Sequence, residues 1–211
     1  MSAARDRTVR WRRAWDKQAR TYDKQMRFMD RVLFGDSRSW ACSQATGEVL
    51  EVAVGTGLNL TEYPDEVALT GIDFSDEMLG IARARAAELD RGARLLQGDA
   101  HSLPFADATF DTVVCTFGLC AIPDIDVAVA EMHRVLRPAG RLVLVDHVES
   151  SASLARAVQR LLEFVTVPTA GEHFLRRPLN EVRTAGFSVE RTERFKLGVV
   201  ERLTARKPSG L

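Results

Sequence analysis

Hydrophobic and polar residues follow two alternating patterns from residue 47 onward. Short runs rich in valine, isoleucine and leucine are typical of buried strands, and between them apolar residues recur at helical spacing. The expected strands are, in chain order, Glu48–Val54, Ala68–Asp73, Arg94–Gln97, Thr109–Thr116, Arg141–Asp146, Phe187–Phe195 and Val199–Ala205. This alternation predicts an α/β fold built on a parallel sheet.

The helices expected between the strands have recognisable boundaries. Ser75 is a suitable N-cap, and Pro138 and Gly140 are expected to stop the helix that precedes them. The expected helices cover Ser75–Leu89, Ile125–Leu136, Leu154–Val165 and Pro178–Ala185. Because strands and helices alternate, we expect a doubly wound sheet that helices cover on both faces.

The first 40 residues differ from the rest of the chain. Large apolar residues recur there at three-, four- and seven-residue intervals, with arginines and lysines between them: Trp11, Trp15, Tyr22, Met26, Met29 and Leu33. Residues 1–31 carry ten basic and four acidic side chains, whereas residues 32–140 carry seven basic and seventeen acidic ones. The pattern predicts a basic amphipathic helix or two short ones. Either its aromatic stripe packs on the domain, or it forms a lid that also contacts anionic lipid or an anionic acceptor.

The composition limits the class of protein. A chain of 211 residues, 45% hydrophobic and 27% charged, is typical of one globular domain. Its 29 basic and 29 acidic side chains balance, which argues against general nucleic-acid binding. Three cysteines do not form a disulfide framework, and no apolar stretch has the length of a membrane span or the features of a signal peptide. A cytoplasmic protein is therefore expected.

The residues after the first strand favour close approach of a ligand. In the segment Glu51–Gly57, two glycines permit a sharp turn beside a bound group. A dinucleotide-binding fingerprint would need a further glycine where Leu60 stands, so this class of site is excluded. The carboxylate of Glu51, four residues before Gly55, suits a cationic ligand.

Chemically suitable residues also end the next three strands. Asp73 follows the glycine turn by about 20 residues, where a carboxylate can accept both hydroxyls of a ribose. Asp99, in the turn Gly98-Asp99-Ala100, suits an exocyclic adenine amine. Thr116 and Phe117 end the fourth strand, where the reacting group is expected. Because parallel strands end at the same edge of the sheet, we expect these side chains to surround one ligand.

These segments carry a resemblance to a known family. Together with 71–79, Leu103-Pro104-Phe105, Phe110-Asp111 and Arg134–Gly140, they resemble the class I S-adenosylmethionine-dependent methyltransferases, among them the small enzymes related to ubiquinone/menaquinone-biosynthesis methyltransferases. The run Val113–Cys120 is similar more narrowly to the bacterial phosphatidylethanolamine N-methyltransferase-like and the alkyl-thiol methyltransferase-like enzymes. The resemblance covers roughly residues 15–207.

The resemblance implies the fold and the organisation of the chain. The fold expected is a Rossmann-like, doubly wound, mostly parallel seven-stranded sheet with a C-terminal antiparallel strand and an N-terminal helical lid. Residues 1–211 would form a single methyltransferase domain. Its parts would be a basic amphipathic helical lid over 1–40, a cofactor-binding core over 47–147, an acceptor-binding region over 150–186 and a terminal hairpin over 187–207.

The resemblance also implies S-adenosylmethionine as the cofactor and S-adenosylhomocysteine as its product. The turn Ala53–Gly57 would hold the methionine part with Glu51 near its ammonium, Asp73 would bind the ribose, and Asp99 the adenine amine. The expected cofactor-binding residues are Tyr22, Glu51, Ala53, Gly55, Gly57, Asn59, Asp73, Phe74, Met78, Asp99, Ala100, Thr116 and Phe117. One departure is Ala53, which replaces the first glycine of the family's turn and is expected to be tolerated if its backbone angles are ordinary.

Two histidines are candidates for a general base. His147 follows Asp146 at the end of the fifth strand, and His173 lies in the variable region where relatives build the acceptor pocket. For both, a hydrogen bond to a neighbouring loop is the alternative interpretation. His101 is expected at the adenine rim and His133 in solvent, and no metal site is expected.

Four other reactive or charged residues have less specific interpretations. Cys115 and Cys120 are expected to be buried small apolar residues, with a redox pair as the alternative. Arg176 and Arg177 are expected to be a solvated pair, with contact to a phosphate on the acceptor as the alternative.

The sequence leaves the methyl acceptor open. An amine or a thiol on a small molecule or lipid head group is favoured, with peripheral membrane contact through the N-terminal helix. The alternative is C- or O-methylation of a quinone-like or natural-product aromatic ring, and a more remote one is a non-catalytic S-adenosylmethionine-binding module. No nucleic-acid partner is expected, and the residues do not indicate an oligomeric state.

Overall fold

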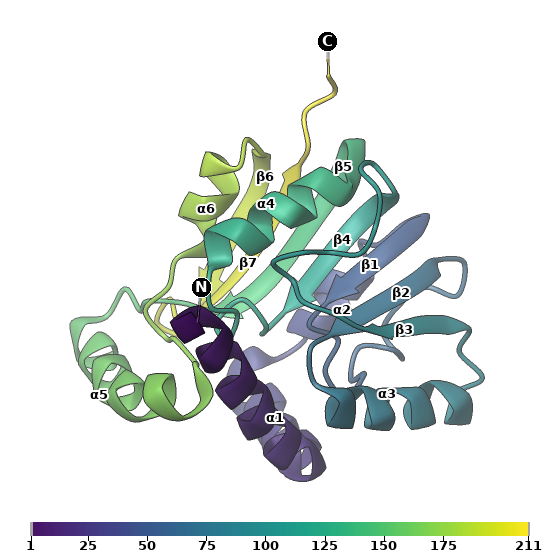
Figure 1. Ribbon diagram of the computed structural model, residues 1–211. Coiled ribbons are helices and arrows are strands. Elements are labelled where there is room, and N and C mark those ends of the chain that lie inside the picture. Colours follow the sequence, from purple (N-terminus) through teal and green to yellow (C-terminus); the bar gives the residue numbers. More distant parts are fainter. Residues whose placement is uncertain (1, 211) are drawn as a thin grey trace.

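The computed structural model describes residues 2–210, with side chains described over 9–210; Met1 and Leu211, which the predicted domain 1–211 includes, lie outside the described residues. Seven strands form one sheet in the order β3-β2-β1-β4-β5-β7-β6 (Figure 1). They are β1 (Glu48–Val52), β2 (Ala68–Asp73), β3 (Ala93–Gln97), β4 (Phe110–Thr116), β5 (Leu136–His147), β6 (Ser188–Phe195) and β7 (Val200–Arg206). Strands β1 to β5 are parallel, and β7 pairs antiparallel with both β5 and β6. The predicted seven-stranded sheet is confirmed.

The helices are α1 (Ser2–Met29), α2 (Ser37–Cys42), α3 (Asp76–Glu88), α4 (Ile125–Val135), α5 (Ser153–Ala170) and α6 (Pro178–Thr184), with a π-helical turn, η1 (Asp30–Phe34), after α1. The N-cap of α3 is confirmed, because the Ser75 hydroxyl accepts a hydrogen bond from the backbone N–H of Met78 at 3.2 Å. Figure 1 shows α4 and α6 against the same part of the sheet.

Alternating strand residues build a hydrophobic core on each face of the sheet. Leu50 and Val113 belong to one core, which α4 and α6 complete with residues such as Met132. Their neighbours Val49 and Val114 point the other way and belong to the second core, with residues of α2 and α3. Both faces of the central strands are buried, as expected for parallel strands with helices on both sides.

The boundary between α4 and β5 differs from the prediction. We expected a helix over Ile125–Leu136 that Pro138 and Gly140 stop, but α4 ends at Val135 and β5 begins at once, with Pro138 inside it. The residue before a proline disfavours helical backbone angles, so Arg137 favours extended chain before Pro138 itself is reached. Leu136 then pairs with Phe110 of β4 and extends the sheet.

The N-terminal segment forms one long helix that lies over the carboxyl ends of the strands. Asp16 Oδ1 and the Ser75 hydroxyl are 2.5 Å apart, and Asp23 accepts a hydrogen bond from the Thr56 hydroxyl at 2.6 Å and pairs with Arg85. These contacts attach α1 to the glycine turn and to α3, and the expected helical lid is present. Among the helices that the structure describes, none is both long and apolar enough to cross a bilayer.

Candidate active site

A cavity of about 730 Å³ lies where β1, β2, β3 and β4 end, and it opens to solvent. This volume includes the open space at the mouth of the cavity. Nine of the predicted cofactor-binding residues line it: Tyr22, Ala53, Gly55, Asp73, Phe74, Met78, Asp99, Ala100 and Phe117. The other four, Glu51, Gly57, Asn59 and Thr116, are not among its lining residues. Trp15 of α1 also lines the cavity, so the N-terminal helix forms one of its walls.

The turn after β1 has a left-handed backbone at three positions. Gly55 and Gly57 have φ angles of +56° and +76°, which glycine adopts without strain. Ala53 has a φ angle of +60°, so the ordinary backbone angles expected for this alanine are absent. Its methyl group also packs closely, because a Cβ added to Gly118 would lie only 2.7 Å from it. The turn therefore carries local strain where the family pattern has glycine.

Asp73 joins two backbone segments at the floor of the cavity. One carboxylate oxygen accepts a hydrogen bond from the N–H of Gly55 and the other from the N–H of Ser75, each at 2.9 Å. Burial raises the pKa of Asp73 to about 6, although these N–H donors oppose the rise. Each oxygen keeps a second lone pair, so the carboxylate can also accept hydroxyl groups of a ligand.

A polar network that lies behind the glycine turn connects β1, β4 and α2. The Asn59 side-chain amide donates to Glu51 Oε1 at 2.7 Å and to the Thr116 hydroxyl at 2.8 Å. Arg38 Nη1 donates to Oδ1 of the Asn59 side chain at 3.1 Å, and the guanidinium carbon lies 5.0 Å from the centre of the Phe117 ring. Arg38 is not among the predicted site residues, because it belongs to no motif. It reaches the network from α2, a helix of six residues.

Two charged atoms of this network lack partners. Glu51 Oε2 and Arg38 Nη2 are both buried and make no hydrogen bond with the described residues. Burial raises the pKa of Glu51 to about 7, while Tyr63, Asn59 and Arg38 oppose the rise. A buried acid and a buried base with unused hydrogen-bonding capacity suit a ligand that carries both charges.

Asp99 and His101 form the rim of the cavity at the end of β3. Asp99 Oδ1 accepts hydrogen bonds from the backbone N–H of His101 at 2.9 Å and lies 2.6 Å from its Nδ1. His101 Nε2 accepts from the backbone N–H of Asp124 at 3.1 Å, which connects this rim to the loop after β4. The hydrogen bond from His101 lowers the pKa of Asp99, so a carboxylate faces the ligand here.

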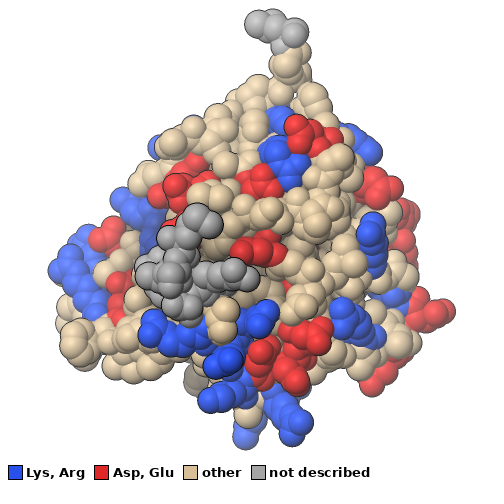
Figure 2. All heavy atoms as spheres, viewed as in Figure 1, with Lys and Arg blue, Asp and Glu red and all other residues tan. Residues whose placement is uncertain are grey.

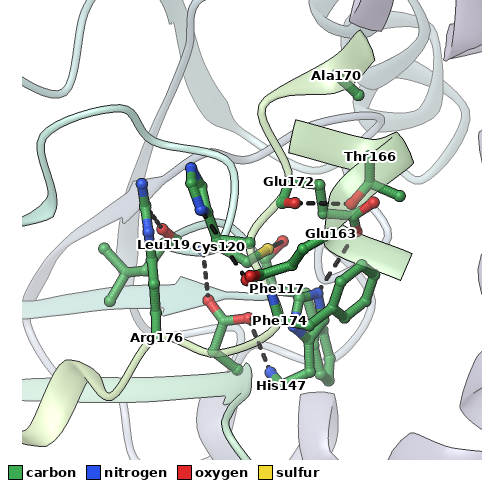
Figure 3. A network of polar contacts seen from close by, with 12 residues as sticks. Phe117, Leu119, Cys120, His147, Glu163, Thr166, Ala170, Glu172, Phe174 and Arg176 are labelled. Carbon is green, nitrogen blue, oxygen red and sulfur yellow. Dashed lines mark hydrogen bonds and ion pairs between the residues drawn. The ribbon is translucent and has the colours of Figure 1, made fainter. Parts of the chain in front are cut away.

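His147 ends β5 in a buried cluster of polar groups (Figure 3). Its Nε2 lies 3.4 Å from a Glu172 oxygen, its Nδ1 lies 3.9 Å from Asp146 Oδ1, and its ring stacks on Phe174. Burial lowers the pKa of His147, but the carboxylates of Glu172 and Asp146 outweigh this effect and raise it. No sequence pattern connects His147 with Glu172, which lies 25 residues further along the chain.

Two other histidines have different surroundings. His173 follows Glu172 in the chain, and its backbone N–H donates to the Cys120 carbonyl at 2.9 Å. His173 does not line the cofactor cavity; its Nδ1 is 4.0 Å from a Glu163 oxygen, and burial lowers its pKa. His133 is less solvated than predicted: it is partly exposed, and its ring packs edge-on against Phe187 with 4.8 Å between ring centres. The last hairpin brings Phe187 to α4, which the helical pattern alone does not reveal.

Arg176 supports the loop after β4 and is not the solvated side chain that we expected. It is half-buried and donates to the backbone carbonyls of Leu119, Ile122 and Pro123, while Arg177 is exposed. Cys115 and Cys120 are buried free thiols, as predicted.

Comparison with known proteins identifies the family. A family model described as a methyltransferase domain matches residues 50–144. The chain is 42% identical over 169 residues to a phosphatidylethanolamine N-methyltransferase of Cereibacter sphaeroides, covering 78% of this chain and 76% of that relative. The chain belongs to the class I S-adenosylmethionine-dependent methyltransferases. It is thus an enzyme whose methyl donor is S-adenosylmethionine, as the resemblance implied.

Other relatives of this methyltransferase differ in their named activity. A demethylmenaquinone methyltransferase of Deinococcus radiodurans is 38% identical over 154 residues, covering 68% of this chain and 64% of the relative. A SAM-dependent methyltransferase from Thermotoga maritima has a TM-score of 0.70 at 22% identity, covering 92% of this chain and 99% of that one. The [4+2]-cyclase SpnF shares the fold with a TM-score of 0.67 at 23% identity, covering 83% and 80% of the two chains.

The residues of this methyltransferase fit the cofactor. S-adenosylmethionine ends in an amino-acid group with one ammonium and one carboxylate. Glu51 and Arg38 carry the two opposite charges directly behind the glycine turn, although neither is a lining residue of the cavity. Asp73 and Asp99 line the cavity with oxygen acceptors for hydroxyl and amine donors. The chemistry of the donor set therefore agrees with the family assignment.

Proposed function

We propose that this methyltransferase acts on an amine carried by a lipid head group, with phosphatidylethanolamine as the first acceptor to test. A thiol on a small molecule is the nearest alternative acceptor. The observation that carries the proposal is an exposed apolar face on α5, which lies within the predicted acceptor-binding region 150–186.

The α5 surface consists of Leu154, Val158, Leu161, Leu162, Phe164 and Val165. All six side chains are exposed, Phe164 to 83% and Leu154 to 80%. Monomeric soluble proteins rarely leave such a continuous apolar strip in water, so its exposure favours contact with another apolar phase.

Basic side chains accompany this apolar strip. Arg160 on α5 and Arg10, Arg13 and Lys17 on α1 are exposed, and Figure 2 shows basic residues around both helices. Each basic side chain near an anionic membrane contributes about 1 kcal/mol to binding. An amphipathic helix with arginines beside its apolar face is typical of attachment to a bilayer surface. The predicted peripheral membrane contact thus gains support from α5 as well as from the N-terminal helix.

The named activity of one relative described above agrees with an amine on a lipid head group as the acceptor. The Cereibacter sphaeroides enzyme is named for N-methylation of phosphatidylethanolamine, and the similarity to it spans 169 residues. A neutral amine is already a nucleophile, so methyl transfer to it needs alignment and exclusion of water more than a general base.

The residues at the strand ends would align the donor. When bound, S-adenosylmethionine supplies a methyl group on a positively charged sulfur. The nucleophile would bond to the methyl carbon in line with the carbon–sulfur bond, and S-adenosylhomocysteine would leave as a neutral thioether. Asp73 would accept the ribose hydroxyls and Asp99 the adenine amine. Glu51 and Arg38 would pair with the ammonium and carboxylate of the methionine end. Such positioning supplies up to about 7–11 kcal/mol of barrier reduction.

Two aromatic residues would shield the reacting end of the cavity. Phe117 ends β4 with a φ angle of +54°, and Tyr22 reaches the cavity from α1. Phe117 also stacks on Phe34 at 3.9 Å between ring centres, which fixes its position. These rings would exclude water from the site where the methyl group moves.

The test measures S-adenosylhomocysteine formation with vesicles of phosphatidylethanolamine and anionic lipid, with phosphatidylcholine vesicles and with free ethanolamine. Turnover is expected only with the first. A Leu161→Gln/Phe164→Gln double variant should lose vesicle binding and turnover, and Leu89→Gln, which changes an exposed leucine after α3, should keep both. Calorimetry with S-adenosylhomocysteine checks that each variant still binds the product. The proposal fails if phosphatidylethanolamine vesicles give no product with an enzyme that binds S-adenosylhomocysteine.

Carbon methylation of a quinone-like ring is the second candidate function. The Deinococcus radiodurans relative, named for demethylmenaquinone, supports it. A ring carbon acceptor requires removal of a proton, and the proposed bases are His147 first and His173 second. Turnover of a naphthoquinol that His147→Ala abolishes would favour this candidate over the lipid amine.

A further inference from the structure

Three side chains of different metal-binding types converge beside the cofactor cavity. Cys120 lies in the loop after β4, His147 ends β5, and Glu172 lies in the segment between α5 and α6. Their ligand atoms, a thiol sulfur, an imidazole nitrogen and a carboxylate oxygen, all lie within 4.8 Å of one another. Figure 3 shows these side chains pointing toward the same region. The sequence gives no sign of this cluster, because its members are more than 20 residues apart.

The distances between these ligand atoms are close to those around a tetrahedrally coordinated zinc ion. Bonds of about 2.0–2.3 Å from zinc to nitrogen, oxygen and sulfur place neighbouring ligand atoms about 3.3–3.6 Å apart. His147 Nε2 and Glu172 Oε1 are 3.4 Å apart, within this range. The Cys120 sulfur lies within 4.8 Å of the other ligand atoms, so it would approach them by up to about 1 Å on binding an ion.

Asp146 supports two of these three residues from behind. Its carboxylate accepts hydrogen bonds from the backbone N–H groups of Cys120 at 3.0 Å and His147 at 2.8 Å. It also lies 3.9 Å from His147 Nδ1, a buried nitrogen without a hydrogen-bond partner in the described chain. In metal sites the second nitrogen of a ligating histidine commonly donates a hydrogen bond to a carboxylate. Asp146 is the nearest carboxylate to Nδ1 among the contacts of His147, and at 3.9 Å it would have to come closer to accept that bond.

The segment that carries Glu172 is also held in place. The Thr166 hydroxyl donates to the backbone carbonyl of Glu172 at 2.8 Å. Glu163 accepts hydrogen bonds from the backbone N–H groups of Phe174 and Leu175 at 2.6 and 2.8 Å. Backbone contacts therefore fix the position of the segment that carries the third ligand.

We propose that Cys120, His147 and Glu172 bind one divalent cation of the zinc type and leave its fourth tetrahedral position open. A thiolate, an imidazole and a carboxylate favour zinc over magnesium or calcium, which prefer oxygen ligands alone. Phe117 and Gly118, in the same loop as Cys120, line the cofactor cavity, so the ion lies on the acceptor side of it. It also connects the segment between α5 and α6 to the sheet.

The metal site does not depend on which acceptor the enzyme uses. An ion on His147 Nε2 does, however, take the lone pair that a general base needs. Zinc binding and the quinone candidate with His147 as its base therefore exclude each other. The experiment below contains no acceptor, so its failure leaves the lipid-amine proposal standing.

The test measures zinc bound per chain after dialysis and the visible absorption of the cobalt(II) form, which reports a thiolate ligand in a tetrahedral site. About one zinc per chain is expected for the wild type. Glu172→Gln should weaken zinc binding at least about tenfold, whereas Glu172→Cys, which supplies a second thiolate, should keep it. Cys120→Ser should abolish the thiolate absorption, and Cys42→Ser, a change at another buried cysteine, should leave it unchanged.

Two results would overturn the proposal. One is a wild-type chain that binds no zinc in a saturable way. The other is equal zinc affinity in the wild type and in Glu172→Gln. The comparison of Glu172→Gln with the wild type remains decisive even if Cys120→Ser does not fold. The Glu172 side chain is partly exposed and an amide has nearly the same shape as a carboxylate, so this variant is expected to fold.

Discussion

The cofactor side and the acceptor side of the active site are built in different ways. On the cofactor side, Gly55, Asp73 and Asp99 each follow a strand, and the parallel sheet brings the strand ends together. On the side proposed for the acceptor, Cys120, His147 and Glu172 come from three segments that are far apart in the chain. The first arrangement repeats one local rule, whereas the second depends on the complete fold. The family resemblance accordingly describes the donor well and the acceptor poorly.

The largest effect is expected from Asp73→Asn. This change removes a charge that orders both Gly55 and Ser75 and would hold the ribose, so affinity for S-adenosylhomocysteine should fall by about 1–3 kcal/mol. Titration calorimetry measures the loss, with Asp76→Asn as the control on the exposed first turn of α3. Equal affinities for the two variants would show that the ribose lies elsewhere.

The second effect is a pH dependence of cofactor binding. Burial raises the pKa of Glu51 to about 7 and that of Asp73 to about 6, so both are partly protonated near neutral pH in the free protein. A cationic ammonium favours ionised Glu51, so affinity should rise with pH and fall by up to about tenfold per pH unit below 7.

Calorimetry between about pH 5.5 and 8.5 tests this direction. In Glu51→Gln the affinity should be lower, and the part of the slope near pH 7 should disappear. A wild-type affinity that is constant or falls with rising pH would contradict the role of Glu51.

The third effect concerns the attachment of α1, which forms a wall of the cofactor cavity. Asp23→Asn keeps the shape of the side chain but removes the charge that pairs with Arg85, so S-adenosylhomocysteine affinity should fall by about 1 kcal/mol. Lys24→Gln, at the next, exposed position of the helix, is the control. If both variants bind the ligand as the wild type does, closure of α1 does not contribute to affinity.

The smallest effect is expected from Ala53→Gly. This change relieves the strain of an alanine with a left-handed backbone conformation, which should stabilise the folded protein by about 1 kcal/mol or less. Part of the gain is offset because glycine makes the unfolded chain more flexible. Ala139→Gly is a matched control, because Ala139 has a φ angle of +61° outside the cavity. Thermal unfolding should shift similarly in both, and only Ala53→Gly should change cofactor affinity. A destabilised Ala53→Gly protein would mean that the packing of the methyl group outweighs the strain.

The residues predicted correctly are those whose environment follows from their neighbours in sequence. Ser75 caps α3 because a helix starts after it, and Asp73 reaches the cavity because a strand ends there. Arg38 and Glu172 were missed because their partners lie far away in the chain. The expectation for Arg176 was wrong for the same reason, since carbonyl groups near residue 120 surround it.

A hydrogen bond joins α1 to the end of α5. The indole nitrogen of Trp15, whose side chain lines the cofactor cavity, donates to the backbone carbonyl of Ala170, the last residue of α5, at 3.2 Å. A movement of α1 away from the cavity would break this hydrogen bond. If α5 attaches to a bilayer as proposed, product release and that attachment would therefore be coupled.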